Sequence, residues 1–261
     1  MKHYEDNFAH DRLPHPSLQA ECFTGHEDFE FPESLNCVER LLDRHIAEGN
    51  GNRVAIRTHE TTWTYQELYE KANQIAHVLR ENLDFVPGNR VMIRSANNPM
   101  YVACWFGILK AGGIVVATMP LLREKELSVM IESAEISHAL CDYRLEDDLR
   151  AVKSPFVKHI VTFDGTGTGI SKLETLMGNK PKTIDNFPTR SDSLSIIGFT
   201  SGTTGKPKMT AHYHKDILLI CEAFPKHCLQ PVPEDIFTGS PPLGFTFGLG
   251  GLVLFPFYYG A

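Results

Sequence analysis

The sequence lacks an excess of basic charge. Its 261 residues carry 25 Lys and Arg against 32 Asp and Glu, which gives a formal net charge of −7. A chain of this charge offers no basic field to hold the phosphates of nucleic acid or an anionic membrane surface. With 42% hydrophobic and 22% charged residues, the composition is that of an ordinary globular protein. We therefore expect neither nucleic acid nor membrane as a partner.

Paired cysteines, targeting signals and internal repeats are also lacking. The six cysteines form no C-x-x-C pair, and several lie in apolar runs, so we interpret them as reduced and structural. The first 16 residues, MKHYEDNFAHDRLPHP, contain no apolar segment of the kind found in secretory signals. These features predict a cytoplasmic protein.

Residues 243–261 form a 19-residue run without a charge, which is long enough to span a membrane. Five glycines and Pro256 favour a buried segment instead. Because folded chains normally end in polar, exposed residues, an apolar end at Ala261 suggests that the chain is the N-terminal part of a longer protein.

The rest of the chain alternates strand and helix patterns. A capping box at Thr64 and Glu67 opens one amphipathic helix, and Asn98, Pro99 and Gly112 delimit another. Expected strands are 53–58, 90–95, 113–118, 138–142, 158–163 and 193–200, and further helices are expected near 123–134 and 145–152. This alternation predicts an α/β fold with a largely parallel sheet flanked by helices.

A polar, turn-rich stretch at 178–193 resembles a linker between two sheet units. We therefore divide the chain into a first α/β subdomain with an irregular N-terminal arm (1–190) and the start of a second (191–261).

A loop rich in glycine, hydroxyl and lysine side chains follows the last expected strand. The predicted phosphate-binding residues are Thr200, Ser201, Gly202, Thr203, Thr204, Gly205, Lys206 and Lys208. Glycines let backbone N–H groups turn toward an anion, hydroxyls add donors, and lysines offset the charge of a polyphosphate. A Walker loop is excluded, because Thr200 stands in place of its first glycine and Pro207 follows Lys206. The remaining alternative is a simple surface turn.

The segment FTSGTTGKPK (199–208) resembles the signature loop of the adenylate-forming superfamily, which includes acyl-CoA synthetases, peptide-synthetase adenylation domains and luciferases. WTYQELYEKANQIAHVL (63–79) and LKAGGIVVAT (109–118) are similar to two earlier motifs of that family. The sequence departs from many members at Met209, where they have glycine. The resemblance implies the N-terminal portion of such an enzyme, in two sheet units and without the C-terminal lid domain.

PPLGFTFGLGG (241–251) resembles the aromatic motif that walls the acyl pocket in this superfamily, and by this match Phe245, Thr246, Phe247 and Gly248 line the pocket. The alternative is that Phe245 and Phe247 are plain core. Thr246 stands where relatives that activate amino acids have aspartate, which disfavours a peptide-synthetase role. Together with the segment at 31–46, the motif is most similar to benzoate- and aminobenzoate-CoA ligases, so an aryl acid is the favoured substrate.

His212 and His214 form an H-x-H on the expected strand after the loop, where they could share a face as a metal pair. No third ligand is evident, so we predict no metal held by the protein side chains. The sequence also contains no G-x-S-x-G or H-E-x-x-H motif, which leaves hydrolase and zincin functions without support.

The resemblance implies ATP-dependent conversion of a carboxylic acid to acyl-AMP and then to a coenzyme A thioester, with ATP, Mg²⁺ and coenzyme A as cofactors. Its residues for magnesium, for the ribose and for catalysis on the lid would lie beyond Ala261, so the catalytic residues are unknown and this chain alone is expected to be inactive. The alternatives are an aliphatic acyl-CoA synthetase, another adenylating enzyme, or a non-catalytic nucleotide-binding fragment. Oligomer formation is possible.

Overall fold

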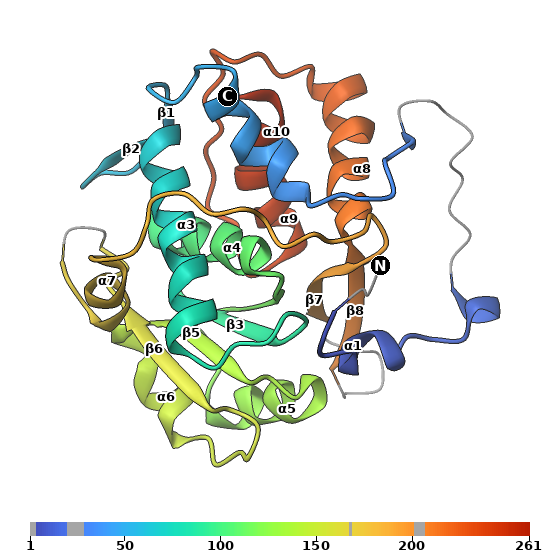
Figure 1. Ribbon diagram of the computed structural model, residues 1–261, viewed down its shortest axis with the longest axis vertical. Helices are drawn as coiled ribbons and strands as arrows, with labels where there is room; N and C mark the ends of the chain where they lie inside the picture. The colour runs from blue at the N-terminus through green and yellow to red at the C-terminus, as the bar shows by residue number, and fades with distance from the viewer. Residues whose placement is uncertain (1–3, 20–28, 167–168, 201–206) are drawn as a thin grey trace.

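The structure is a computed structural model that describes residues 4–19, 29–166, 169–200 and 207–261. Its centre is a six-stranded sheet in the order β6-β5-β3-β4-β7-β8 (Figure 1). All neighbouring strands are parallel except β7 and β8. The strands are β3 (Arg90–Arg94), β4 (Ile114–Thr118), β5 (His138–Asp142), β6 (His159–Phe163), β7 (Leu194–Thr200) and β8 (Lys208–Tyr213). The predicted α/β class with a largely parallel sheet is confirmed.

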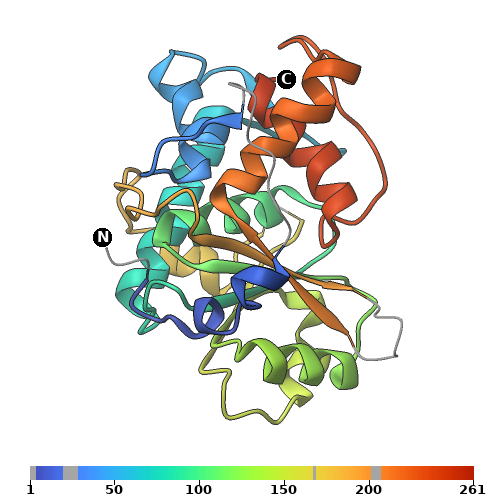
Figure 2. The same cartoon turned by 90° about the vertical axis from the view of Figure 1, so that its right-hand side faces the viewer.

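The sheet has a hydrophobic core on each face. Val91 and Ile93 of β3 belong to one core, while Met92 between them belongs to the other. This alternation follows from the two-residue period of a strand, and it explains why the central strands are apolar at nearly every position. Figure 2 shows the sheet between the two layers of helices.

The helices of the first layer are mainly α3 (Tyr65–Asn82), α4 (Pro99–Ala111) and α8 (His214–Phe224), and those of the second are α5 (Glu124–Ala134) and α6 (Glu146–Ala151). Shorter helices are α1 (Phe8–Asp11), α2 (Arg44–Ala47), α7 (Lys172–Met177), α9 (Thr246–Leu249) and α10 (Phe255–Tyr259). Single turns of 3₁₀ helix lie at η1 (Pro16–Leu18) and η4 (Tyr143–Leu145), and π-helical turns at η3 (Glu39–Asp43), η5 (Pro225–Leu229) and η6 (Gly250–Leu254).

The predicted helix boundaries are confirmed at α3 and α4. The Thr64 hydroxyl accepts the Glu67 N–H at 3.2 Å, and the Glu67 carboxylate accepts the Thr64 N–H at 2.7 Å. The Asn98 side chain caps α4 by accepting the Tyr101 N–H at 2.9 Å, and Gly112 ends the helix with a φ of +88°. Each contact satisfies a backbone group that the helix itself leaves unpaired.

Thr64→Ala should lower the free energy of unfolding by about 1 kcal/mol, because the N–H of Glu67 loses its acceptor. Urea denaturation of wild type and variant measures the difference. Thr175→Ala is the control, because Thr175 lies within α7 and not at its N-cap. An equal loss in both variants would contradict the capping argument.

The N-terminal arm packs across the sheet, where the buried Tyr4 hydroxyl donates to the Leu194 carbonyl at 2.6 Å. The hairpin β1 (Val54–Arg57) and β2 (Thr62–Thr64) forms a separate two-stranded sheet. The polar stretch 178–193 leads into β7, which pairs with β4 in the main sheet. The division of the chain at 190/191 stays a prediction.

The apolar end of the chain folds into the successive helical turns α9, η6 and α10 (Figure 1). The Phe257 carbonyl of α10 bonds to His45 Nε2 at 2.7 Å, and the Tyr65 hydroxyl of α3 donates to the Ala261 carbonyl at 3.1 Å. The Phe257 ring packs against Tyr65 and Phe106. Among the described residues, no helix has the length and apolarity needed to cross a membrane.

Candidate functional site

The sheet has a topological switch point between β3 and β5. From β3 the chain moves to β4 on one side, and it then returns to β5 on the other side of β3. In open parallel sheets, ligands bind outside the carboxyl ends of the strands at such a point. The candidate site is therefore sought at this edge of the sheet.

The predicted phosphate loop begins at the same edge. β4 and β7 are parallel neighbours, so the carboxyl end of β7 at Thr200 lies on the side of the sheet where β4 ends. Thr200 pairs with Lys208 in the antiparallel ladder of β7 and β8, and this pair closes the base of a hairpin. The loop is thus flanked by two strands, as predicted, while Ser201, Gly202, Thr203, Thr204, Gly205 and Lys206 lie outside the described residues.

The segment predicted to wall an acyl pocket also reaches this edge. At Gly244, an added Cβ atom would lie 2.8 Å from the carbonyl oxygen of Thr118, the last residue of β4. The buried side chain of Leu243 joins the core beside it. The structure therefore brings 243–244 to the end of β4, next to the strand that leads into the phosphate loop.

The predicted pocket residues differ in exposure. Phe245 is 44% exposed and Phe247 80% exposed, so neither ring is buried in the core of this chain, and their role in an acyl pocket stays a prediction. Thr246 is exposed, whereas Gly248 is buried. An added Cβ at Gly248 would lie 2.2 Å from the Pro242 carbonyl oxygen, so only glycine fits there without a shift of the backbone.

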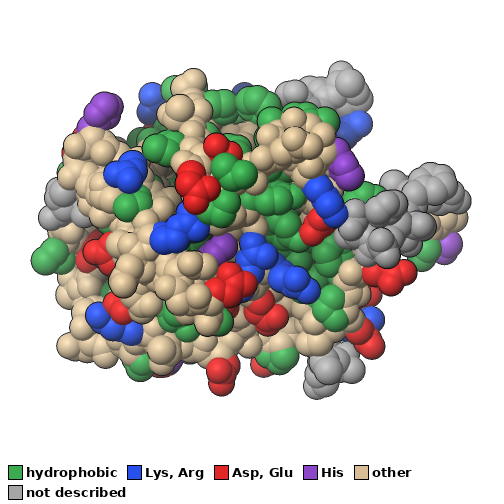
Figure 3. All heavy atoms as spheres, turned by 90° about the horizontal axis from the view of Figure 1, so that it is seen from above, with side chains coloured by type: hydrophobic (Ala, Val, Ile, Leu, Met, Phe, Trp, Pro, Cys, Tyr) green, Lys and Arg blue, Asp and Glu red, His purple; other side chains and the backbone are tan. Residues whose placement is uncertain are grey.

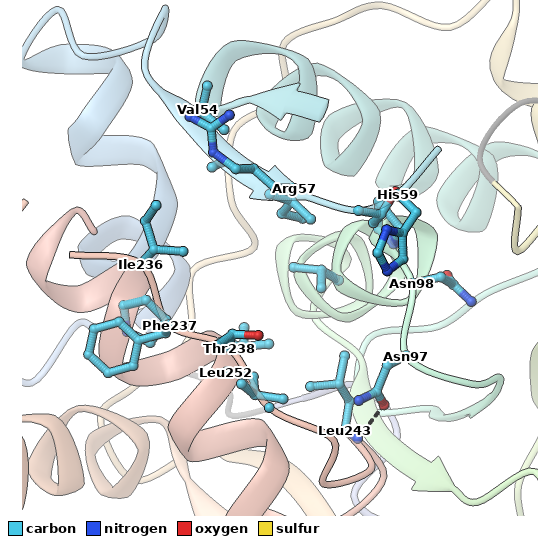
Figure 4. Close-up of a pocket in the computed structure, with 18 of the residues that line it drawn as sticks. Val54, Arg57, His59, Asn97, Asn98, Ile236, Phe237, Thr238, Leu243 and Leu252 are labelled. Atoms are coloured by element: carbon cyan, nitrogen blue, oxygen red, sulfur yellow. Dashed lines mark hydrogen bonds between the residues drawn. The ribbon is translucent and has the colours of Figure 1, made fainter. Parts of the chain in front are cut away.

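A cavity of about 800 Å³ lies beside this segment (Figure 4). It is lined by 54–60 of the β1 hairpin, by 96–99 after β3, by 235–239 and by apolar residues of η6 and α10. Leu243 contributes to the wall, but Phe245, Thr246, Phe247 and Gly248 do not. This cavity is thus distinct from the predicted acyl-binding residues, which lie at the carboxyl ends of the strands.

Charges of both signs are interspersed on the face that carries the end of the chain, with hydrophobic side chains between them (Figure 3). In the cavity wall, Arg144 is paired with the buried Asp142 at 2.6 Å. Within the described part of the chain, no group of three or more His, Cys, Asp or Glu side chains could hold a metal ion. We therefore assign no described residue to the Mg²⁺ that the family resemblance implies.

The structure corrects the expectation for His212 and His214. His212 lies on β8, but His214 is the first residue of α8, so the two do not alternate along one strand. The buried His214 accepts the Cys37 N–H through Nδ1 at 3.2 Å. Burial lowers the pKa of His214 to about 3. His214 is therefore a neutral structural contact between the N-terminal segment and α8.

Two residues that the sequence analysis did not single out hold the 241–243 segment. Asn97 bonds to Pro241 and Leu243, and the Tyr101 hydroxyl donates to the Leu243 carbonyl at 2.9 Å. The only local signal was the run Asn97-Asn98-Pro99, in which Asn98 is needed as the helix cap and Asn97 is not. Their shared target becomes visible only in the tertiary structure.

Comparison with known proteins agrees with this architecture. The benzoate-CoA ligase of Thauera aromatica is 26% identical over 234 residues, which cover 89% of this chain and 44% of the ligase. The acetyl-coenzyme A synthetase of Bacillus subtilis is 23% identical over 270 residues, with 100% and 46% covered. The crystal structure of the anthranilate CoA ligase AuaEII with anthranoyl-AMP superimposes with a TM-score of 0.82 at 26% identity, covering 90% of this chain and 46% of that one.

The chain spans less than half the length of these relatives. The sequence profile of the AMP-binding enzyme family matches residues 43–261, which includes every strand and most helices of the fold. The chain therefore belongs to the AMP-binding enzyme family.

Proposed function

We propose that the protein activates a carboxylic acid with ATP and transfers the acyl group to coenzyme A. A carboxylate oxygen attacks the α-phosphorus of ATP, the bond to the β-phosphate breaks, and pyrophosphate leaves. The thiol sulfur of coenzyme A then attacks the acyl carbonyl, AMP leaves, and the thiol proton is released. Placement and charge neutralisation are the main tasks of the protein in such a reaction.

One observation carries this proposal: the hairpin of β7 and β8 begins the 200–208 segment at the sheet edge where β4 and Gly244 meet. A loop with this sequence, mounted there, would offer N–H groups, hydroxyls and lysines to the departing pyrophosphate, with Lys206 and Lys208 as replaceable cations. The exposed Phe245 and Phe247 then offer aromatic surface to an acid.

We propose an aryl acid such as benzoate or aminobenzoate as the substrate. The benzoate- and anthranilate-CoA ligases among the relatives support this choice. The similarity to an acetyl-coenzyme A synthetase supports an aliphatic acid as the second candidate. A comparison of benzoate, 2-aminobenzoate and acetate as ligands separates the two.

The combined variant Lys206→Ala and Lys208→Ala should weaken ATP binding by at least about tenfold, since even one charge-assisted hydrogen bond contributes about 1.5–3 kcal/mol. Isothermal titration of the 261-residue chain with ATP and Mg²⁺ measures the affinity. Lys172→Ala, in an exposed helix start far from the loop in sequence, is the control. Unchanged ATP affinity in the double variant would contradict the proposal that the loop binds phosphate.

We further propose that the 261-residue chain alone does not turn over. The described residues contain no metal-binding cluster, and misplacement of reacting groups can cost on the order of a hundredfold in rate. Acid-dependent pyrophosphate release tests this directly. Robust turnover would show that the chain holds a complete catalytic site.

A further inference from the structure

The segment that leads into Phe245 is held by side chains from the carboxyl end of β3. Asn97, in the turn between β3 and α4, makes two hydrogen bonds to it. Its Nδ2 donates to the Pro241 carbonyl at 2.9 Å, and its Oδ1 accepts the Leu243 N–H at 2.9 Å (Figure 4). One side-chain amide therefore spans Pro242 and satisfies backbone groups on both sides of it.

Tyr101 completes the arrangement. Its buried hydroxyl donates to the Leu243 carbonyl at 2.9 Å, so the backbone N–H and the backbone carbonyl of Leu243 are both hydrogen-bonded to side chains. Asn98 accepts the Tyr101 N–H at 2.9 Å and so fixes the start of α4 between these two side chains. The contacts from Asn97 and Tyr101 to Leu243 therefore depend on one helix cap.

The hold on Leu243 extends to the aromatic residues that follow. The Phe245 N–H donates to the Pro242 carbonyl at 3.1 Å, and the Phe245 carbonyl accepts the Leu249 N–H at 2.9 Å. Gly248 packs against the same Pro242 carbonyl oxygen. The turn at 242–245 and α9 therefore form one unit, and movement of 241–243 would carry Phe245 and Phe247 with it.

We propose that Asn97 is the positioning residue that holds the segment 241–248, which we take to bind the acid, at the carboxyl ends of β3 and β4. The proposal rests on the proposed function, because it takes Phe245 and Phe247 to contact the acid. Asn97 itself does not touch the acid. It acts through Leu243, which is why its loss should alter acid binding and leave ATP binding unchanged.

The first test measures, without any ligand, how firmly Asn97 holds the backbone at Leu243. In Asn97→Ala, hydrogen exchange at the Leu243 amide should accelerate about tenfold, because the amide loses a hydrogen bond of about 1–1.5 kcal/mol. Asn97→Asp keeps the acceptor oxygen and should retain most of the protection. Gln74→Ala is the matched control, because the Gln74 amide also makes two hydrogen bonds to the backbone, donating to the Met177 and Lys180 carbonyls, but far along the chain from the segment.

The second test measures binding to the 261-residue chain. 2-Aminobenzoate is fluorescent, so its affinity can be read by anisotropy, and ATP affinity can be measured by calorimetry. Asn97→Ala should weaken 2-aminobenzoate binding about tenfold, Asn97→Asp by less, and both should leave ATP affinity within about twofold. A purely structural role would lower both affinities together, as general unfolding does.

Tyr101→Phe and Tyr4→Phe provide a further matched pair, because each removes one buried hydroxyl that donates to a distant carbonyl. Only Tyr101→Phe should alter 2-aminobenzoate affinity. The proposal is overturned if Leu243 exchanges equally fast in wild type and Asn97→Ala, or if acid affinity is unchanged in a variant whose exchange has risen. Failure of the wild-type chain to bind 2-aminobenzoate would count against the proposed aryl substrate. The exchange measurement would still show whether Asn97 holds the backbone at Leu243.

Discussion

Gly248→Ala should destabilise the protein by about 3 kcal/mol, because a side chain forced into a filled site typically costs 1–3 kcal/mol and sometimes more. The new Cβ would lie 2.2 Å from the Pro242 carbonyl oxygen and 2.7 Å from that of Pro241. The Pro242 oxygen also accepts the Phe245 N–H, so it cannot retreat without breaking the turn. Denaturant unfolding of wild type and variant measures the loss.

Gly251→Ala is the matched control for this prediction. Gly251 lies three residues further along in η6, and no atom lies within 4 Å of an added Cβ there. Alanine is favoured over glycine in a helix by up to about 1 kcal/mol, so this variant should be as stable as wild type or slightly more stable. A similar loss in both variants would assign the effect to helix backbone and not to the contact with Pro242.

Mild acid should destabilise the fold strongly. Burial lowers the pKa of His138 to about 4 and that of His214 to about 3, against 6.5 for an unperturbed histidine. Below pH 6.5 the unfolded chain takes up protons that the folded chain does not, so stability falls as the pH falls toward the folded pKa values. Between pH 6.5 and 5 the two residues together should cost about 3 kcal/mol, because the loss for each group rises from half of 1.36 kcal/mol per pH unit at pH 6.5 toward the full value at pH 5.

The hydrogen bonds of His138 and His214 support a neutral ring in the folded state, and therefore a loss of stability as the pH falls. His138 Nε2 lies 2.7 Å from the Leu83 carbonyl oxygen and its Nδ1 lies 2.7 Å from the Ser137 hydroxyl, which fits a neutral ring with the proton on Nε2. His214 Nδ1 accepts the Cys37 N–H, and a proton there would break that bond.

Urea midpoints measured from pH 7 to pH 5 test the prediction. His214→Asn should be less stable at pH 7 but should depend less steeply on pH, because one group that takes up a proton on unfolding is gone. His59→Gln is the control, because His59 is exposed and should leave the slope as in wild type. An unchanged slope in His214→Asn would show that this residue does not contribute.

Local patterns in the sequence predicted the elements well. The capping residues at Thr64 and Asn98 act within four residues of their targets, so sequence spacing suffices to find them. Strand order could not be predicted in this way, because β7 joins β4 across 75 intervening residues, from 119 to 193. The run His212-Tyr213-His214 fits a strand by alternation, but the backbone turns into α8 where the Tyr213 N–H meets the Asp216 carboxylate.

The sequence proposes the residues of the candidate site, but it does not indicate which distant segments the fold brings beside them. Glycine, hydroxyl and lysine residues predict a phosphate-binding loop after Thr200, because such loops combine those residue types, and this role stays a prediction. The hold of Asn97 on Leu243 spans 146 residues, and nothing in either local sequence requires the other. The cavity beside β1 likewise arises from segments distant in the chain and is not signalled by any motif.

The contacts of α10 with α2 and α3 also bear on how the chain is synthesised. His45 and Phe257 are 212 residues apart, and Tyr65 and Ala261 are 196 apart. At about 5–20 residues per second, Phe257 and Ala261 are synthesised roughly 10–40 s after His45 and Tyr65. During that interval the apolar surface around Tyr65 and Phe106 has no cover from Phe257. The nascent chain should therefore depend on chaperones most between the emergence of α4 and that of α10.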